Sequence, residues 1–244
     1  MTSAIRPVVS AVAVLAAALL MAGCTSSPGA TSPTSSSAPQ ESGTPAPTTG
    51  DEVEAAWLDD GRMFAIVTQG SSTCIPAVET VTADGQTVTV ALAVTEGEDA
   101  ACTADFAPRA SVGALPEGVD PTEDVEFVVT LDGRTDDVDL DGDAALTGVP
   151  GSPTEYAPSA GWLDDGSLVL LTWGSSSCAP VVEAVEGSGA TGTVTFTTAE
   201  DQVCTMDMAP RATLIAFGDD QVDDDDFQLT LVGANLDATV AVRG

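Results

Sequence analysis

The block Gly70-Ser71-Ser72-x-Cys74-x-Pro76-x-Val78-Glu79 recurs along the chain as Gly174-Ser175-Ser176-x-Cys178-x-Pro180-x-Val182-Glu183. Two flanking blocks recur in the same order: Trp57-Leu58-Asp59-Asp60-Gly61 as residues 162–166, and Cys102-Thr103-x-Asp105-x-Ala107-Pro108-Arg109-Ala110 as residues 204–212. The offset between the copies falls from 105 at Trp57 to 104 at Gly70, 102 at Cys102 and 100 at Phe127, which places short insertions or deletions in loops. Matches of this length in one order indicate that a unit of about 90 residues is duplicated.

Both copies carry strand signals and almost no helix signals. Alternation of β-branched and small residues is clearest in Thr87–Val94 and Thr193–Thr198, and Val125–Leu131 and Val138–Leu140 add further strands. Asp-Gly pairs between apolar runs predict hairpin turns, at residues 60–61, 84–85, 132–133 and 165–166. About six to eight strands per copy predict an all-β chain: two tandem copies of a small antiparallel β-sandwich or barrel-like domain, each with one disulfide.

Four cysteines follow Cys24, and each copy holds one pair: Cys74 with Cys102, and Cys178 with Cys204. Four cysteines allow three pairings. The duplication selects the pairing within a copy, because an ancestral single copy could pair only with itself. A loop of about 29 residues closed by a disulfide gains roughly 3.5 kcal/mol on the chain-entropy model. Zinc is the alternative, but it favours closely spaced Cys or His ligands, and the chain has no His.

Residues 1–23 have the features of a bacterial lipoprotein signal peptide. Arg6 supplies the positive charge, Val8–Ala22 is apolar apart from Ser10, and Leu20-Met21-Ala22-Gly23-Cys24 resembles the lipobox. This resemblance implies cleavage before Cys24 and a lipid on its sulfur, so that acyl chains such as palmitate anchor the protein. The apolar run is shorter than the roughly 20 residues that span a membrane. The alternative is an ordinary secretory signal with an incidental cysteine.

Composition divides the remainder of the chain. Residues 24–51 hold the lipidated Cys24 and a stretch of Ser, Thr, Pro, Ala and Gly, which we expect to be a disordered tether. The first β-domain takes residues 52–142 and the second takes residues 158–244. The linker between them, residues 143–157, is short and rich in Pro and Gly, so we expect the two copies to touch.

The charge balance limits the possible partners. The chain has 38 acidic and 6 basic residues, a net charge of −32, and all basic residues are Arg. This balance predicts no nucleic acid partner, because binding phosphates requires many Lys and Arg residues. A basic protein surface or a cation remains compatible with the charge. The simplest interpretation is that the acidic residues keep the protein soluble.

The sequence lacks the residues of most known catalytic arrangements. Without His and Lys there is no Ser-His-Asp triad and no Schiff-base lysine. Paired carboxylates, as in glycosidases, remain, but carboxylates are so abundant here that their number is no argument for a site. The Gly-Ser-Ser blocks lack a base to activate a hydroxyl, so we interpret them as turns beside the cysteines. We therefore predict that the protein is not an enzyme.

One calcium candidate stands out, and no other cofactor is predicted. Asp137-x-Asp139-x-Asp141-Gly142 resembles the start of an EF-hand loop. The position of the bidentate Glu is taken by Gly148, and the flanks do not look helical. The aligned stretch of the second copy, 238–242, has no ligand set. A last strand with outward polar residues is the competing interpretation.

Polar residues that recur in both copies form the remaining candidate set: Glu79, Asp105, Arg109, Glu183, Asp207 and Arg211. An Arg in so acidic a chain is expected to find a carboxylate, and a bidentate Arg–carboxylate clamp would brace the disulfide loop. The alternative is that Arg109 and Arg211 face solvent and bind an anionic group of a ligand.

The lipobox together with the G-S-S-x-C-x-P and C-T-x-D-x-A-P-R blocks resembles uncharacterised actinobacterial cell-surface lipoproteins with a duplicated domain. The resemblance implies a lipid-anchored position on the extracytoplasmic face of the cell membrane and a β-rich domain, but no activity. We therefore expect a non-enzymatic binding or interaction module, with an extracytoplasmic protein or a cell-wall ligand as partner. The alternatives are an acidic cation-binding or cell-wall structural protein and, third, a carboxylate-dependent hydrolase.

Overall fold

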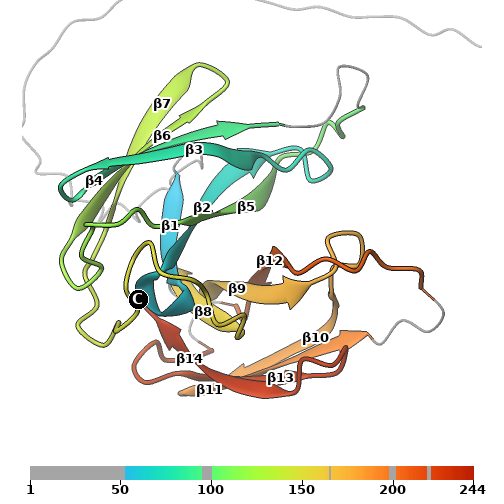
Figure 1. Ribbon diagram of the computed structural model, residues 1–244. Coiled ribbons are helices and arrows are strands. Elements are labelled where there is room, and N and C mark those ends of the chain that lie inside the picture. The colour runs from blue at the N-terminus through green and yellow to red at the C-terminus, as the bar shows by residue number, and fades with distance from the viewer. Residues whose placement is uncertain (1–52, 95–100, 165, 198–201, 219–220) are drawn as a thin grey trace, which may run out of the picture. The chain divides into compact units, whose positions relative to one another are not determined.

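The computed structural model describes residues 53–94, 101–164, 166–197, 202–218 and 221–244 (Figure 1). The expected signal peptide, Cys24, the whole tether and the turn residue Asp165 lie outside the described residues. Within them, no helix has the length and apolarity that crossing a membrane requires.

The described residues of the first copy form seven strands, and these make two sheets. The three-stranded sheet has the order β1-β2-β5, and the four-stranded sheet has the order β3-β4-β6-β7. A short 3₁₀ turn, η1 (Asp59–Gly61), connects β1 to β2. The strands are β1 (Glu54–Leu58), β2 (Met63–Gly70), β3 (Ala77–Asp84), β4 (Thr87–Ala93), β5 (Ala107–Ala114), β6 (Val125–Leu131) and β7 (Arg134–Leu140).

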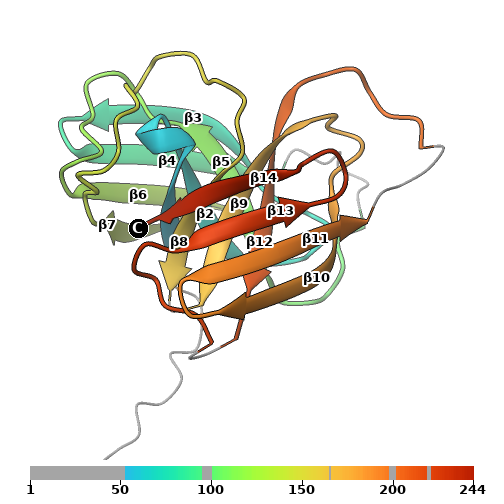
Figure 2. The ribbon, with the colours of Figure 1, turned by 90° about the horizontal axis from the view of Figure 1, so that it is seen from below.

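The second copy repeats these pairings in one continuous sheet of order β10-β11-β13-β14-β8-β9-β12. Figure 2 shows its strands β10, β11, β13 and β14 side by side. The sheet is continuous because β14 pairs with β8 in parallel, at Val242–Ala160 and Arg243–Gly161. The strands are β8 (Ser159–Asp164), β9 (Ser167–Gly174), β10 (Val181–Ser188), β11 (Thr191–Thr197), β12 (Ala209–Ala216), β13 (Gln228–Val232) and β14 (Ala238–Arg243).

The predicted all-β class and the hairpins are confirmed, but the finer prediction of antiparallel sandwiches or barrels is not. Two-residue turns join β3 to β4 at Gly85–Gln86 and β6 to β7 at Asp132–Gly133, where Asp132 and Gly133 both have positive φ, as a type I′ turn requires. However, β4–β6 and β11–β13 are parallel, as is β14–β8. After β4 the chain leaves its sheet to form β5 and re-enters as β6, and such a crossover allows parallel pairing.

Each copy has its own apolar core. In the first copy, Trp57 and Phe64 from the three-stranded sheet pack with Phe127 from the four-stranded sheet, so one core serves both sheets. The Phe64 and Phe127 ring centroids are 4.9 Å apart. In the second copy, Trp162 takes the place of Trp57 and Phe227 takes the place of Phe127, and their ring centroids are 5.1 Å apart.

A third apolar cluster joins the two copies through the other faces of the sheets that hold β2 and β9. Residues Met63–Thr68 of β2 are all buried, although alternate side chains of a strand point to opposite faces. Val67 therefore meets the second copy while Ile66 faces its own core. Val169 and Leu171 are the counterparts on β9. Equivalent strands contact each other, β1 with β8 and β5 with β12, so the interface is nearly self-complementary.

Leu171 provides the test of this interface. It is fully buried in the cluster between the copies, so Leu171→Ala removes apolar contacts that no other side chain replaces. We expect a loss of about 2–5 kcal/mol in the free energy of unfolding, measured by urea denaturation. Val149→Ala, at a site that is 66% exposed, is the control and should change stability by less than about 0.5 kcal/mol. Equal effects of the two substitutions would contradict the interface.

Candidate functional site

The disulfides close one end of each copy. Cys74 bonds Cys102 and Cys178 bonds Cys204, as predicted, with Cα atoms 5.5 and 5.6 Å apart. We call the segments that they join the disulfide-closed ends: residues 70–76 with 101–106 in the first copy, and residues 174–180 with 202–208 in the second. Each end connects β2 to β3 and precedes β5, or the equivalent strands β9, β10 and β12.

An arginine, buried in the first copy and partly buried in the second, braces each disulfide-closed end through backbone carbonyls. Arg109 is 8% exposed, and its Nη1 donates to the carbonyl oxygen of Cys74 at 2.7 Å. Its Nη2 donates to the carbonyl oxygen of Gln69 at 3.2 Å. Arg211 repeats this with Cys178 at 2.9 Å and Trp173 at 2.8 Å. Burial lowers the pKa of Arg211.

The predicted Arg–carboxylate clamp is therefore wrong. Among the described residues the only ion pair joins Arg62 to Asp59, at 3.5 Å. The planar guanidinium instead donates from its two Nη atoms to two backbone carbonyl groups, while the buried Nε has no hydrogen-bond partner among the described residues. Burial also argues against the alternative, in which Arg109 faces solvent to bind an anion.

The recurring glycine before each Ser-Ser pair makes room for that arginine. A Cβ on Gly70 would lie 2.6 Å from Cζ of Arg109, and a Cβ on Gly174 would lie 2.9 Å from Nη1 of Arg211. Any side chain at these positions would displace the guanidinium from its carbonyl partners. The Gly of the Gly-Ser-Ser block is thus explained by a close approach across the sheet, which the sequence pattern alone did not reveal.

The recurring aspartate ties the two segments of each end together. The backbone N–H of Ser72 donates to Oδ1 of Asp105 at 3.2 Å, and the Thr103 hydroxyl donates to the same atom. Hydrogen bonds from Ser72 and then Thr103 lower the pKa of Asp105 to about 2. In the second copy, hydrogen bonds from Thr205 and then Ser176 lower the pKa of Asp207 to about 2. The serine hydroxyls thus belong to a bracing network.

The other sequence candidates take outward positions. Glu79 and Glu183 are exposed and lie where the registers of β3–β4 and β10–β11 shift, so each is the extra residue of a β-bulge. Neither forms an ion pair with a described residue.

The predicted calcium loop is a strand instead. Asp137 and Asp139 lie on the exposed face of β7, two residues apart, and Asp141 follows the end of the strand. An extended strand spaces such residues by about 6.6 Å, whereas an EF-hand loop folds its ligands around one ion. The described residues contain no group of three or more Asp, Glu, Cys or His side chains placed to share a metal ion.

Large apolar side chains are exposed at the disulfide-closed ends. Of the nine exposed large apolar residues in the described part of the chain, five lie there: Ile75, Phe106, Val203, Met206 and Met208. Phe106 is 64% exposed and Met206 is completely exposed. Sequence reasoning missed this feature, because a strand-rich sequence gives no signal for which apolar residues remain outside the core.

A pocket adjoins each disulfide-closed end, and the two pockets occupy equivalent places. The first has a volume of about 520 Å³ and the second about 270 Å³. Val53, Gln69 and Phe106 of the first pocket match Pro158, Trp173 and Met208 of the second, at the sequence offsets of 105, 104 and 102 found for the duplication. The first pocket is lined by charged residues as well, whereas Trp173 and Tyr156 form an edge-to-face pair, 5.0 Å apart, in the second.

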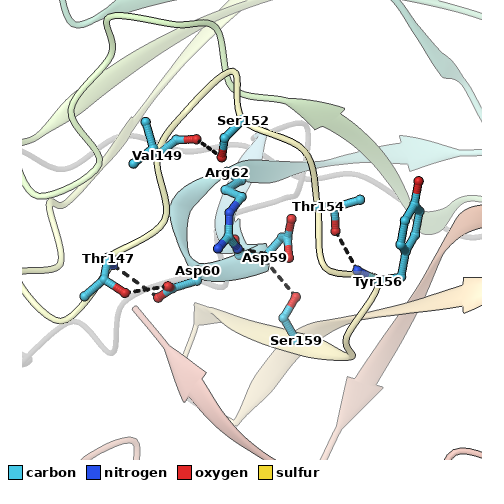
Figure 3. A network of polar contacts seen from close by, with 9 residues as sticks. All are labelled: Asp59, Asp60, Arg62, Thr147, Val149, Ser152, Thr154, Tyr156 and Ser159. Atoms are coloured by element: carbon cyan, nitrogen blue, oxygen red, sulfur yellow. Dashed lines mark hydrogen bonds and ion pairs between the residues drawn. The ribbon is translucent and has the colours of Figure 1, made fainter.

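Away from the disulfide-closed ends, the turn η1 holds a buried carboxyl group (Figure 3). Asp59 is 4% exposed, and burial raises its pKa. Asp59 and Asp60 have φ values of 48° and 57°, a conformation that Asp tolerates better than most residues. The Asp59 N–H donates to the Ser159 hydroxyl at 2.8 Å, and the Thr147 hydroxyl donates to Asp60 at 2.7 Å. These bonds tie the linker and β8 to the turn, so we interpret it as a joint between the copies.

Comparison of the chain with protein-family models, with curated proteins and with solved structures finds no match.

Asp105 gives a pH-dependent test of the bracing network. Because its pKa is lower in the folded protein than the usual 3.8, the ionised group stabilises the fold above about pH 4, and that stabilisation disappears as the pH falls to about 2. We expect Asp105→Ala to lower the thermal unfolding midpoint at pH 7 and to leave it unchanged at pH 2. Asp137→Ala, also exposed, is the charge-matched control and should have no effect at either pH. A loss of stability for Asp105→Ala that is independent of pH would contradict this role.

Proposed function

We propose that the protein is a non-enzymatic binding module, held on the extracytoplasmic face of the cell membrane by a lipid on Cys24. Its two disulfide-closed ends are the binding surface, and the partner is a protein surface that combines basic and apolar residues. The observation that carries this proposal is the set of apolar side chains exposed at both ends.

Exposure of these side chains has no benefit for folding. Soluble proteins seldom leave large apolar side chains together on the surface unless the surface binds something. Phe and Met are also enriched in protein interfaces relative to the remaining surface. A disulfide, an arginine and an aspartate network cross-link each end, and such cross-links reduce the conformational entropy that is lost on binding.

Charge complementarity favours a basic partner. The chain carries a net charge of −32, and Asp105 and Asp207, which lie within the two ends, keep their charge down to about pH 2. Opposite charge accelerates association and excludes acidic competitors. The lipid anchor supports the same interpretation, because it would hold the module near other proteins of the cell surface.

Anchoring is tested at Cys24 itself. We expect Cys24→Ser to abolish incorporation of radiolabelled palmitate and to move the protein from the detergent phase to the aqueous phase in a phase-separation assay, because the substitution removes the thiol that carries the proposed lipid. Ser26→Ala, two residues further along the chain, should leave both results unchanged. Labelling that persists in Cys24→Ser would contradict the anchor.

Binding is tested with defined peptides. Fluorescence anisotropy would compare three 12-residue peptides: one with Arg and Leu residues, one with Arg and Gly residues, and one with Glu and Leu residues. We expect the full-length chain to bind the Arg-Leu peptide most tightly. The combined substitutions Phe106→Ser, Met206→Ser and Met208→Ser should weaken that binding by about tenfold or more.

Val149→Ser is the matched control, since Val149 is as exposed as Phe106 but lies outside both ends. It should leave binding unchanged. Equal affinity for the two Arg peptides, or equal binding by the triple variant and the control, would show that charge alone attracts the peptides and would contradict the proposed surface.

A further inference from the structure

The pocket of the first copy lies where its core reaches the end of the two strands β6 and β7. Val129 and Leu131 of β6 line it, and they share a face with the core residues Val125 and Phe127 because alternate residues of a strand point the same way. In the β6–β7 ladder, Asp136 stands opposite Val129 and Arg134 stands opposite Leu131. Arg134 and Asp136 therefore occupy core-facing positions of β7, and both are exposed because the pocket is open.

The second copy shows that the fold does not require these charges. In its β13–β14 ladder, Ala238 stands opposite Leu231 and Val240 stands opposite Leu229, so they occupy the places of Arg134 and Asp136. Ala238 and Val240 are partly buried and pack against the core of the second copy. A charged pair on the core-facing side of a strand is thus a special feature of the first copy.

The charged groups around this pocket are of both signs. Arg109 and Arg134 line it together with Asp132 and Asp136. Although it is in a strongly acidic chain, the Arg134 side chain makes no ion pair or hydrogen bond with any described residue. A free guanidinium is a favourable partner for a carboxylate, and it would bind one in bidentate geometry.

From this arrangement we infer that the pocket of the first copy binds a small zwitterion with an apolar side chain, an amino acid or a short peptide of apolar residues. Arg134 binds the carboxylate, and Asp132 and Asp136 bind the ammonium group. Phe106, Val129 and Leu131 contact the apolar side chain. The volume of about 520 Å³ lies within the range of pockets for small molecules. This site goes beyond the proposed docking surface, with which it shares Gly70, Ser71 and Phe106.

Isothermal titration calorimetry of the full-length chain tests the inference with four probes: leucine, leucyl-leucine, N-acetyl-leucine and leucinamide. We expect leucine or leucyl-leucine to bind at millimolar concentration or below. Whichever of the two binds more tightly identifies the free amino acid or the peptide as the ligand class. N-acetyl-leucine lacks the ammonium group and leucinamide lacks the carboxylate, so each should bind about tenfold or more weakly than leucine.

Two substitutions assign the roles, and each introduces the residue that the second copy carries, which keeps the fold intact. Arg134→Ala should remove the preference for leucine over leucinamide, and Asp136→Val should reduce the preference for leucine over N-acetyl-leucine. Asp137→Ala, on the opposite face of the same strand, is the control and should bind as the unmodified chain does. Binding of the Arg-Leu peptide should persist in Arg134→Ala, so that the pocket and the docking surface are tested separately.

Three outcomes would overturn the inference. The first is the absence of heat with both leucine and leucyl-leucine at millimolar concentration. The second is binding of leucinamide alone, which would mean that the two aspartates merely attract a cation. The third is binding that Arg134→Ala and Asp136→Val leave unchanged.

Discussion

The rest of the structure depends on the packing of the two copies against each other. The sheets that contain β2 and β9 are apolar on both faces, so neither copy could leave its partner without exposing Val67 or Leu171 to water. Burying apolar surface drives this association, because it contributes a favourable free energy of about 25 cal/mol per Å². Because equivalent strands contact each other, the same surface of each copy forms the interface, as it does in a symmetric dimer. At the turn η1, the bond from the Asp59 N–H to Ser159 then holds β8, and the bond from Thr147 to Asp60 holds the linker.

The duplication separates the features that hold the fold from those that vary. Both copies keep the disulfide, the arginine that bonds backbone carbonyls, the glycine that makes room for it, and the aspartate that bonds two segments. These residues contact one another or the segments that the disulfide joins, so each has a structural role at the disulfide-closed end. The two pockets differ, because four charged residues line the first, whereas the pair Tyr156 and Trp173 and a single charged residue, Asp237, line the second. Functional specificity is therefore expected in the pockets and in the exposed apolar side chains, where the copies are free to diverge.

Sequence patterns predicted what depends on local chemistry. Alternation in Thr87–Val94 and the Asp-Gly turns required only neighbouring residues, and the cysteine pairing followed from the duplication. Contacts between distant segments were not predictable in the same way. The parallel pairing of β4 with β6 depends on a crossover through the other sheet, and the partners of Arg109 are carbonyl groups, which no sequence pattern distinguishes. The Asp137 series left both a calcium loop and an outward strand face open, because the two have the same residue spacing, and the structure has the strand.

The positions of Arg134 and Asp136 also depend on contacts that sequence patterns do not predict. In the sequence they look like ordinary surface residues of a hairpin, and only the ladder opposite Leu131 and Val129 reveals that they face the end of the core. The exposed apolar residues of the disulfide-closed ends were equally unforeseeable, since burial is decided by the packing of distant strands.

Cooperative unfolding of the two copies tests the central claim, that they form one structure through their shared interface. Trp57 is the only tryptophan of the first copy, and Trp162 and Trp173 are those of the second. Trp57→Phe and the double variant Trp162→Phe, Trp173→Phe therefore report on one copy each during urea denaturation. In either variant, tryptophan fluorescence should follow the same single transition as the loss of strand signal measured by circular dichroism for the whole chain. If in either variant the fluorescence transition is clearly separated from that whole-chain transition, the copies fold independently and the claim is contradicted.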